Sequence, residues 1–168
     1  KKYDSTGAPD TTFGTSGVLT ISSVSVAGEI MPNTPALAVD NANGNLYVVW
    51  DAGVALTANK TVYAKKFSTA GVLDGAFGAS GTLTVGTDTK TNTTDRSFSA
   101  SIDSAGKLYV AINGASGATA ITVKRYTTAG AIDTTYATNG VLTAVSTGNI
   151  VGDPYLVVNG GDNMYALY

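Results

Sequence analysis

The stretch Gly7-Ala-Pro-Asp-Thr-Thr-Phe-Gly-Thr-Ser-Gly17 decides the fold, because the chain carries it in three versions. It returns at 71–81 as Gly-Val-Leu-Asp-Gly-Ala-Phe-Gly-Ala-Ser-Gly and at 130–140 as Gly-Ala-Ile-Asp-Thr-Thr-Tyr-Ala-Thr-Asn-Gly. The common frame is G-x-x-D-x-x-(F/Y)-x-x-x-G, and its copies are 71 − 7 = 64 and 130 − 71 = 59 residues apart. Repetition at such a period predicts an array of structurally equivalent units.

Each position of this motif has a physical role that can be predicted. We expect the Asp to accept backbone N–H bonds in an Asx-type turn, the aromatic residue to fill a loop that otherwise lacks core residues, and the last Gly to supply a positive φ. Equal placement in all copies favours these roles over a convergence of the Asp residues as acids on a central channel. The residues concerned are Asp10, Phe13, Gly17, Asp74, Phe77, Gly81, Asp133, Tyr136 and Gly140.

The composition favours β-structure. Charged residues make up 13% of the 168 residues, hydrophobic residues 43%, and Gly numbers 20. Such a chain suits pleated strands joined by tight turns and is poor material for amphipathic helices. The net charge of −2 provides no basic surface for nucleic acid or an anionic membrane.

Several residue types and patterns are missing from the sequence. There is no Cys and no His, which removes thiolate and imidazole metal ligands and the commonest general base. There is also no run of about 20 apolar residues that could span a membrane.

Period-2 patterning predicts four strands in each unit. The first follows the motif, two more form a hairpin around an Asn/Asp/Gly-rich tip, and the fourth ends in Lys or Arg before the next motif. We expect the motif to be the corner at which the chain leaves one unit for the next. The predicted strands after the motif are 18–21, 82–85 and 141–144; the hairpins are 35–40 with 46–50, 98–103 with 108–112, and 154–159 with 164–168; the basic-ended strands are 61–67 and 121–126.

Four antiparallel strands in about 60 residues are typical of a β-propeller blade with long connectors. The predicted fold is therefore all-β, with tandem four-stranded antiparallel blades; another stacked β array and a sandwich remain alternatives. Residues 1–16 are predicted to be the end of a preceding blade plus the motif loop, 17–80 the first repeat, 81–139 the second, and 140–168 a third, truncated one.

Together the repeats form one domain or a segment of a larger one. Either the chain is part of a longer polypeptide, or several chains assemble into a ring or filament. Both arrangements leave sheet edges that need a neighbour.

One combination of residues resembles a known repeat family. The pattern (K/R)-(F/Y)-x-x-x-G-x-x-D-x-x-(F/Y)-G-x-x-G, followed by D-x-x-G-x-L-Y, is similar to the delta-60 repeat, a propeller-type repeat of large bacterial surface and secreted proteins. The resemblance covers essentially the whole chain, although Tyr136-Ala137 departs from the Phe-Gly of the other copies. It implies a propeller-type architecture and a bacterial surface or secreted origin, and no particular activity.

The residue types leave little for catalysis or metal binding. Glu29 is the only Glu, so a Glu pair for glycoside hydrolysis is excluded, and no nucleotide-binding, serine-hydrolase or zinc-protease motif occurs. The segment 40–45 has some features of a calcium loop but lacks the distal Glu, so we interpret it, like Asp162-Asn163, as a hairpin tip. We therefore predict no enzyme activity, no cofactor and no metal.

These observations favour a non-enzymatic structural or adhesive repeat module, secreted or displayed on a bacterial surface, within an extracellular filament or surface layer. Expected partners are further repeats of the same chain or copies of itself. The alternative is a lectin-like propeller that binds surface glycans, in which Trp50, Tyr47 and Tyr63 would stack on sugars. Core packing between blades is the competing interpretation of these rings, and the one we favour.

Overall fold

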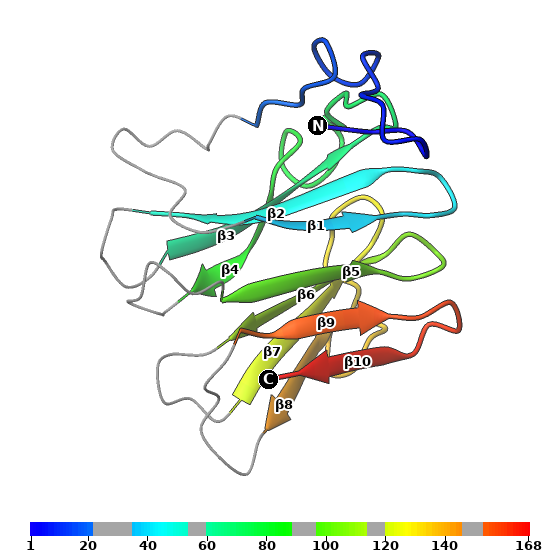
Figure 1. Ribbon diagram of the computed structural model, residues 1–168. Coiled ribbons are helices and arrows are strands. Elements are labelled where there is room, and N and C mark those ends of the chain that lie inside the picture. The colour runs from blue at the N-terminus through cyan, green and yellow to red at the C-terminus, as the bar shows by residue number, and fades with distance from the viewer. Residues whose placement is uncertain (22–34, 54–59, 89–96, 114–119, 146–152) are drawn as a thin grey trace.

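The computed structural model describes residues 1–21, 35–53, 60–88, 97–113, 120–145 and 153–168 (Figure 1). Within these ranges the chain is all-β, as predicted; they contain no helix, and hence no helix able to cross a membrane. The strands are β1 (Ala36–Val39), β2 (Leu46–Ala52), β3 (Lys60–Phe67), β4 (Leu83–Asp88), β5 (Phe98–Ile102), β6 (Leu108–Asn113), β7 (Ala120–Tyr126), β8 (Val141–Val145), β9 (Tyr155–Val158) and β10 (Met164–Leu167).

These strands form three antiparallel sheets. The first two sheets have four strands each, in the order β1-β2-β3-β4 and β5-β6-β7-β8, and the third pairs β9 with β10. The predicted hairpins are confirmed, because β1 pairs with β2, β5 with β6 and β9 with β10. At two of their tips Gly44 and Gly106 have φ values of 69° and 76°, which favour glycine.

The grouping of strands into sheets differs from the predicted one. β4, which follows the second motif, pairs with β3, and β8 pairs with β7 in the same way. A four-stranded sheet therefore combines one hairpin, the basic-ended strand and the strand after the next motif. The prediction that the motif is a corner between units is wrong, because the motif connects two neighbouring strands of one sheet. A tandem repeat shows the spacing between units but not the residue at which one unit ends and the next begins, so it does not show where one sheet ends.

The strand predicted at 18–21 is not formed either. This segment is irregular, apart from an isolated bridge between Thr15 and Val18. Tyr3, the counterpart of Phe67, forms only an isolated bridge with Pro9. Leu19 and Ile21 instead pack against the outer face of the first sheet.

The sheets stack face to face through equivalent surfaces. The face of the first sheet that carries Tyr47 packs against the face of the second that carries Leu108. The opposite face of the second sheet, with Tyr109, packs against the third sheet at Leu156. The first strands of the sheets, β1, β5 and β9, lie side by side (Figure 1). Since the second sheet is covered on both faces, every residue of β6 is buried. The described part of the chain does not close into a ring.

Candidate functional site

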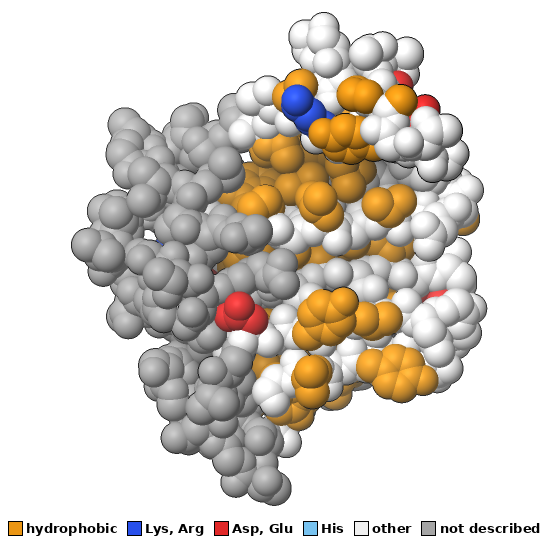
Figure 2. All heavy atoms as spheres, viewed as in Figure 1, with side chains coloured by type: hydrophobic (Ala, Val, Ile, Leu, Met, Phe, Trp, Pro, Cys, Tyr) orange, Lys and Arg blue, Asp and Glu red, His pale blue; other side chains and the backbone are white. Residues whose placement is uncertain are grey.

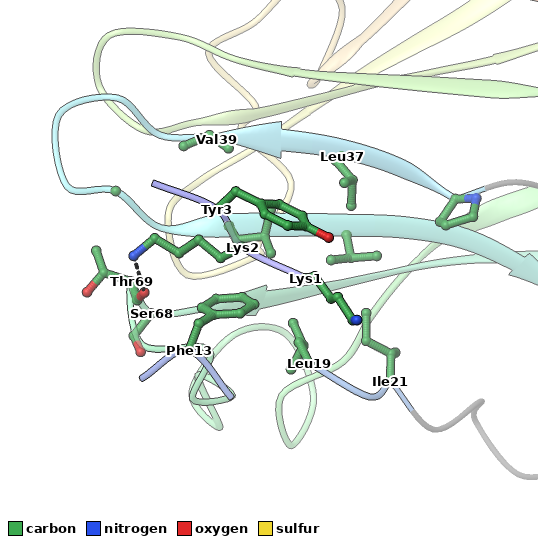
Figure 3. A pocket seen from close by; sticks show the side chains of 14 residues that line it. Lys1, Lys2, Tyr3, Phe13, Leu19, Ile21, Leu37, Val39, Ser68 and Thr69 are labelled. Carbon is green, nitrogen blue, oxygen red and sulfur yellow. Dashed lines mark hydrogen bonds between the residues drawn. The ribbon is translucent and has the colours of Figure 1, made fainter. Parts of the chain in front are cut away.

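The clearest candidate site is an apolar cavity on the outer face of the first sheet. Its volume is about 750 Å³, and it lies between the sheet and residues 1–21. Figure 2 shows apolar side chains gathered beside this segment and again over β9 and β10. Figure 3 shows Tyr3 and Phe13 on one side of the cavity and Leu37 and Val39 of β1 on the other. Other apolar side chains that line it are Leu19, Ile21, Leu46 and Val48.

One charged side chain at the rim of this cavity, that of Lys2, is engaged by its neighbours. Lys2 Nζ forms an ion pair with Asp10 at 2.8 Å and donates to the carbonyl of Thr69 at 3.5 Å. Because most of its lining is apolar, the cavity is suited to apolar side chains. The cavity is not among the sites predicted from the sequence; the signal for it is the match between residues 1–21 and the later repeats.

The motif turns form as predicted. In each copy the Asp Oδ1 accepts the backbone N–H two residues further on, at 3.0 Å for Asp10, 3.0 Å for Asp74 and 3.1 Å for Asp133. The Gly that ends each copy has a φ between 82° and 88°, the range that favours glycine. The structural roles predicted for the Asp and the last Gly are thus confirmed.

Each motif Asp is also paired with the basic residue 10 − 2 = 74 − 66 = 133 − 125 = 8 positions before it. Lys2 is the largest cause that lowers the pKa of Asp10, to about 2, and Lys66, at 3.1 Å, lowers the pKa of Asp74. Each of the three carboxylates is engaged by a basic residue and a turn N–H of its own repeat, which is the geometry of the predicted turn role.

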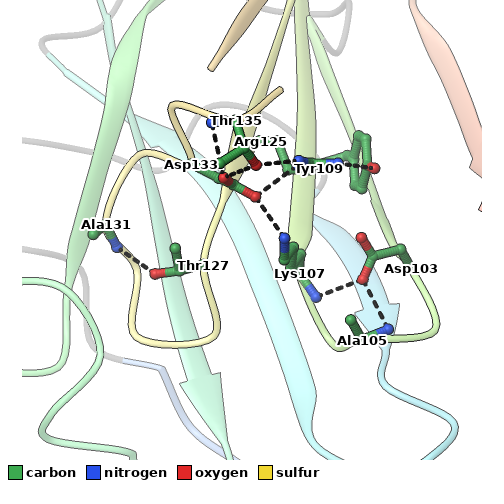
Figure 4. Close-up of polar contacts among 9 residues, drawn as sticks. All are labelled: Asp103, Ala105, Lys107, Tyr109, Arg125, Thr127, Ala131, Asp133 and Thr135. Atoms are coloured by element: carbon green, nitrogen blue, oxygen red, sulfur yellow. Dashed lines mark hydrogen bonds and ion pairs between the residues drawn. The ribbon is translucent and has the colours of Figure 1, made fainter. Parts of the chain in front are cut away.

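The third copy has the densest network of charges (Figure 4). Asp133 Oδ2 lies 2.8 Å from Lys107 Nζ and 2.9 Å from Arg125 Nε. The hydrogen bond from Lys107, followed by that from Thr135, holds the pKa of Asp133 well below its usual range. Because Lys107 precedes β6, this network fastens the motif loop to the hairpin of its own sheet.

Successive motif loops are hydrogen-bonded to one another. Gly14 N–H donates to the carbonyl of Ala70 at 2.8 Å, and Gly78 N–H donates to that of Ala129 at 2.9 Å. A Cβ on Gly71 would lie 2.9 Å from the Gly14 nitrogen, which explains why the first position of the motif is Gly. The motif therefore joins adjacent sheets by contact between loops, although the chain does not cross between sheets there.

The aromatic residue of the motif packs against the tyrosine of the hairpin in the same sheet. Phe77 meets Tyr47 edge to face, with ring centroids 5.6 Å apart, and Tyr136 meets Tyr109 in the same way at 5.4 Å. The Tyr47 hydroxyl donates to the carbonyl of Gly106 in the second sheet at 3.2 Å. Burial raises the pKa of Tyr47 to about 12, so this donor keeps its proton.

The three candidate glycan contacts do not form an exposed platform. Tyr47 and Trp50 are buried, and Tyr63 is half-buried with its ring centroid 5.8 Å from that of Trp50. A sugar stacks on an aromatic face that is open to solvent, and neither buried ring offers one. Tyr47 and Trp50 are core residues, which agrees with the favoured interpretation and gives the glycan alternative no support at these two positions.

A buried cluster of charges, absent from the sequence-based list, lies at the end of the first sheet. Lys60 Nζ is 3.1 Å from Asp51 Oδ2 and 3.4 Å from Asp88 Oδ2, and all three residues are almost fully buried. Asn113 occupies the position of Asp51 in the second sheet, so the cluster is not repeated there. Its lysine is enclosed and ion-paired, which makes it unsuitable as a nucleophile for a substrate from solution.

The segment 40–45 forms a hairpin tip, as predicted. Asp40 Oδ1 accepts the backbone N–H groups of Ala42 and Asn43, at 3.0 and 3.2 Å. Asp162 accepts from the backbone and hydroxyl of Ser104, at 2.8 and 2.7 Å, and so links two neighbouring tips. Over the described ranges, no group of three or more acidic side chains is placed to hold a metal ion.

Comparison with known proteins leaves the function open. No family model matches the sequence, and neither the curated proteins nor the solved structures include a match.

Proposed function

We propose that the chain is a non-enzymatic structural or adhesive module of a secreted or surface-displayed bacterial protein, built from delta-60-type blades that form part of a β-propeller. The observation that carries the proposal is the repeated use of one interface: the first sheet meets the second, and the second meets the third, through equivalent faces. An array whose units contact their neighbours in the same way is a rigid frame with a shape set by repetition.

The arrangement of the sheets supports the propeller part of the proposal. β1, β5 and β9 are neighbours, as the innermost strands of blades around a channel would be. The serine hydroxyls of Ser99 and Ser101 on β5 accept the backbone N–H groups of Leu156 and Val158 on β9, at 3.1 and 2.9 Å. These bonds hold successive first strands close together.

The state of the charged residues supports a role without catalysis. The motif carboxylates are used by their own turns and ion pairs, and the buried lysine is enclosed. The cavity is lined mainly by apolar side chains. These features favour contacts with other proteins over catalysis. The burial of Tyr47 and Trp50 gives the glycan-binding alternative no support at those residues.

Antibody labelling of the cells that produce the protein tests the proposal. An antibody raised against residues 1–168 should label intact, unpermeabilised cells or their extracellular material, and deletion of the gene should weaken adhesion or the cohesion of the surface layer. Labelling that appears only after permeabilisation, together with unchanged adhesion in the deletion strain, would overturn it.

A further inference from the structure

The stack of sheets carries exposed apolar side chains at both ends. Beside the cavity on the first sheet, Leu37 and Val39 are 62% and 50% exposed, and on β10 Tyr165 and Leu167 are 60% and 72% exposed. Adjacent exposed apolar side chains of this size mark sites of protein interaction. The question is which partner fits each end.

The repeats identify the two exposed faces as the two halves of an interface that already exists inside the chain. Tyr165 and Leu167 occupy the positions of Tyr47 and Val49, which are fully buried against the second sheet. The second sheet receives them with residues that match those around the cavity: Ala100, Ile102, Leu108 and Val110 correspond to Leu37, Val39, Leu46 and Val48. Each exposed face is therefore the partner that the other one needs.

Residues 1–21 supply the parts that the third sheet lacks. β9 and β10 correspond to the first two strands of a sheet, and β10 has no further neighbour among the described strands. Residues 1–3 match the end of a third strand (65–67), and residues 18–21 match the start of a fourth (82–85), with the motif between them. One copy of β9 and β10 and one copy of residues 1–21 thus contain the parts of a single sheet.

The aromatic contacts show the same complementarity. Phe77 and Tyr136 each meet a hairpin tyrosine edge to face, at interplanar angles of 78°. Within the described residues no tyrosine meets Phe13 in this way, although Phe13 lines the cavity. Tyr165 is the hairpin tyrosine of the third sheet, so its position matches the place left beside Phe13.

One hydrogen bond between the first and second sheets has an expected counterpart between two copies of the chain. The Tyr47 hydroxyl donates to Gly106 at the hairpin tip of the next sheet. Gly44 is the corresponding tip residue of the first sheet and lines the cavity. The Tyr165 hydroxyl of a chain docked in register would therefore donate to the carbonyl of Gly44.

We propose that the cavity receives Tyr165 and Leu167 of a second copy of this chain, whose β10 pairs with residues 1–3 beside the cavity. The proposal deepens the proposed function and rests on its premise that equivalent faces stack. Two copies joined at both ends would hold 2 × 2 four-stranded sheets and two shared ones, six in all, which is within the usual four to eight blades of a propeller.

Cysteine cross-linking tests the register of this contact, since the natural chain has no Cys. Val48 lies opposite Lys65 in the first sheet, so Ala166 should lie opposite Lys1 of the second copy. Mixing an Ala166→Cys chain with a Lys1→Cys chain of different mass should give a mixed disulfide under mild oxidation. A Val157→Cys chain, with its cysteine on the other strand of the hairpin, should cross-link at least about 10-fold more slowly to the Lys1→Cys chain. Equal rates for the two pairs, or no mixed disulfide, would overturn the proposal.

Charge substitutions test the pairing of unlike ends. Leu37→Glu and Tyr165→Glu should each weaken self-association roughly 100-fold, because each places a charge in the interface. Mixing the two variants should restore a one-to-one complex, since one intact end remains on each chain. Val72→Glu, at a residue 65% exposed in a motif loop, should leave association unchanged. Self-association of the Leu37→Glu chain alone at the natural strength would contradict the head-to-tail contact.

The two proposals fail separately. A 168-residue chain that stays monomeric and does not cross-link would reject self-association and would leave a further repeat of the same polypeptide as the candidate neighbour of β10. Surface labelling of cells would be unaffected by that result. Conversely, correct cross-linking with purely intracellular labelling would reject the surface role and keep the contact between copies.

Discussion

The backbone N–H of Gly78 donates a hydrogen bond of 2.9 Å to the carbonyl oxygen of Ala129, which lies 129 − 78 = 51 residues further along the chain. The bond joins the motif loops of the first two sheets. The second loop also accepts a bond from Gly14 at Ala70, so it is a donor to one neighbour and an acceptor from the other. This double role gives a physical reason why the chain repeats the motif.

Replacing Gly130, the residue after Ala129, should destabilise the protein. A Cβ on Gly130 would lie 2.7 Å from the Gly78 nitrogen, and Gly130 has a φ of 82°. Gly130→Ala should lower the free energy of unfolding by about 2–4 kcal/mol, from the clash and the left-handed backbone together. Gly75→Ala, in the second copy of the motif, is the matched control, because no atom lies within 4 Å of its added Cβ. Urea denaturation measures both, and equal stability of the two variants would argue against loop stacking.

Lys60 should be more important for stability than its surface neighbours. Lys60→Met leaves the carboxylates of Asp51 and Asp88 buried without the cation between them, which should cost about 3–5 kcal/mol. Lys65→Met, on the same strand but half-exposed over Trp50, should cost less than about 1 kcal/mol. Thermal denaturation of the two variants provides the comparison. A Lys60→Met chain as stable as the natural one would show that the cluster does not hold the sheet together.

The ion pair of Lys2 with Asp10 predicts an acid dependence. The pKa of Asp10 is lowered from 3.8 to about 2, chiefly by Lys2. Because the folded-state pKa is the lower one, the pair stabilises the folded state above pH 4 and loses this effect as the pH falls towards 2. Lys2→Met should move the Asp10 midpoint upwards in a carboxyl NMR titration. An unchanged midpoint would mean that the turn alone, through Thr12, accounts for the shift.

The motif aromatic residue should carry much of the packing in its loop. Phe77 is fully buried against Tyr47, so Phe77→Ala should cost about 3–5 kcal/mol. Val72→Ala in the same loop, at a largely exposed side chain, should change stability by no more than about 0.5 kcal/mol. Chemical denaturation distinguishes them. A small effect at Phe77 would contradict its role as the loop's core residue.

Local features were predictable from the sequence, because nearby residues determine them. The Asp of each motif bonds within its own turn, and the hairpin tips at Gly44 and Gly106 depend on backbone conformations that glycine favours. Antiparallel strands with alternating side chains follow from composition and period. These are contacts over a few residues, and the repeated copies reinforce one another.

Non-local features were not predictable in the same way. Nothing in the period distinguishes a sheet that ends before the motif from one that ends after it, so the pairing of β3 with β4 was missed. The Lys60 cluster joins three strands and occurs once, so repetition gave no signal for it. The cavity depends on which face of the first sheet lacks a neighbour, and the match of residues 1–21 to the later repeats locates it only once the stacking of the sheets is known.

The most direct measurement of the central claim is an isotope-filtered NOE experiment on a mixture of labelled and unlabelled chains. Head-to-tail stacking of equivalent faces predicts an NOE between the Phe13 ring of one chain and the Tyr165 ring of the other, lost in the Leu37→Glu variant and kept in Val72→Glu. The absence of any intermolecular NOE between these rings, in a sample concentrated enough to associate, would contradict the account.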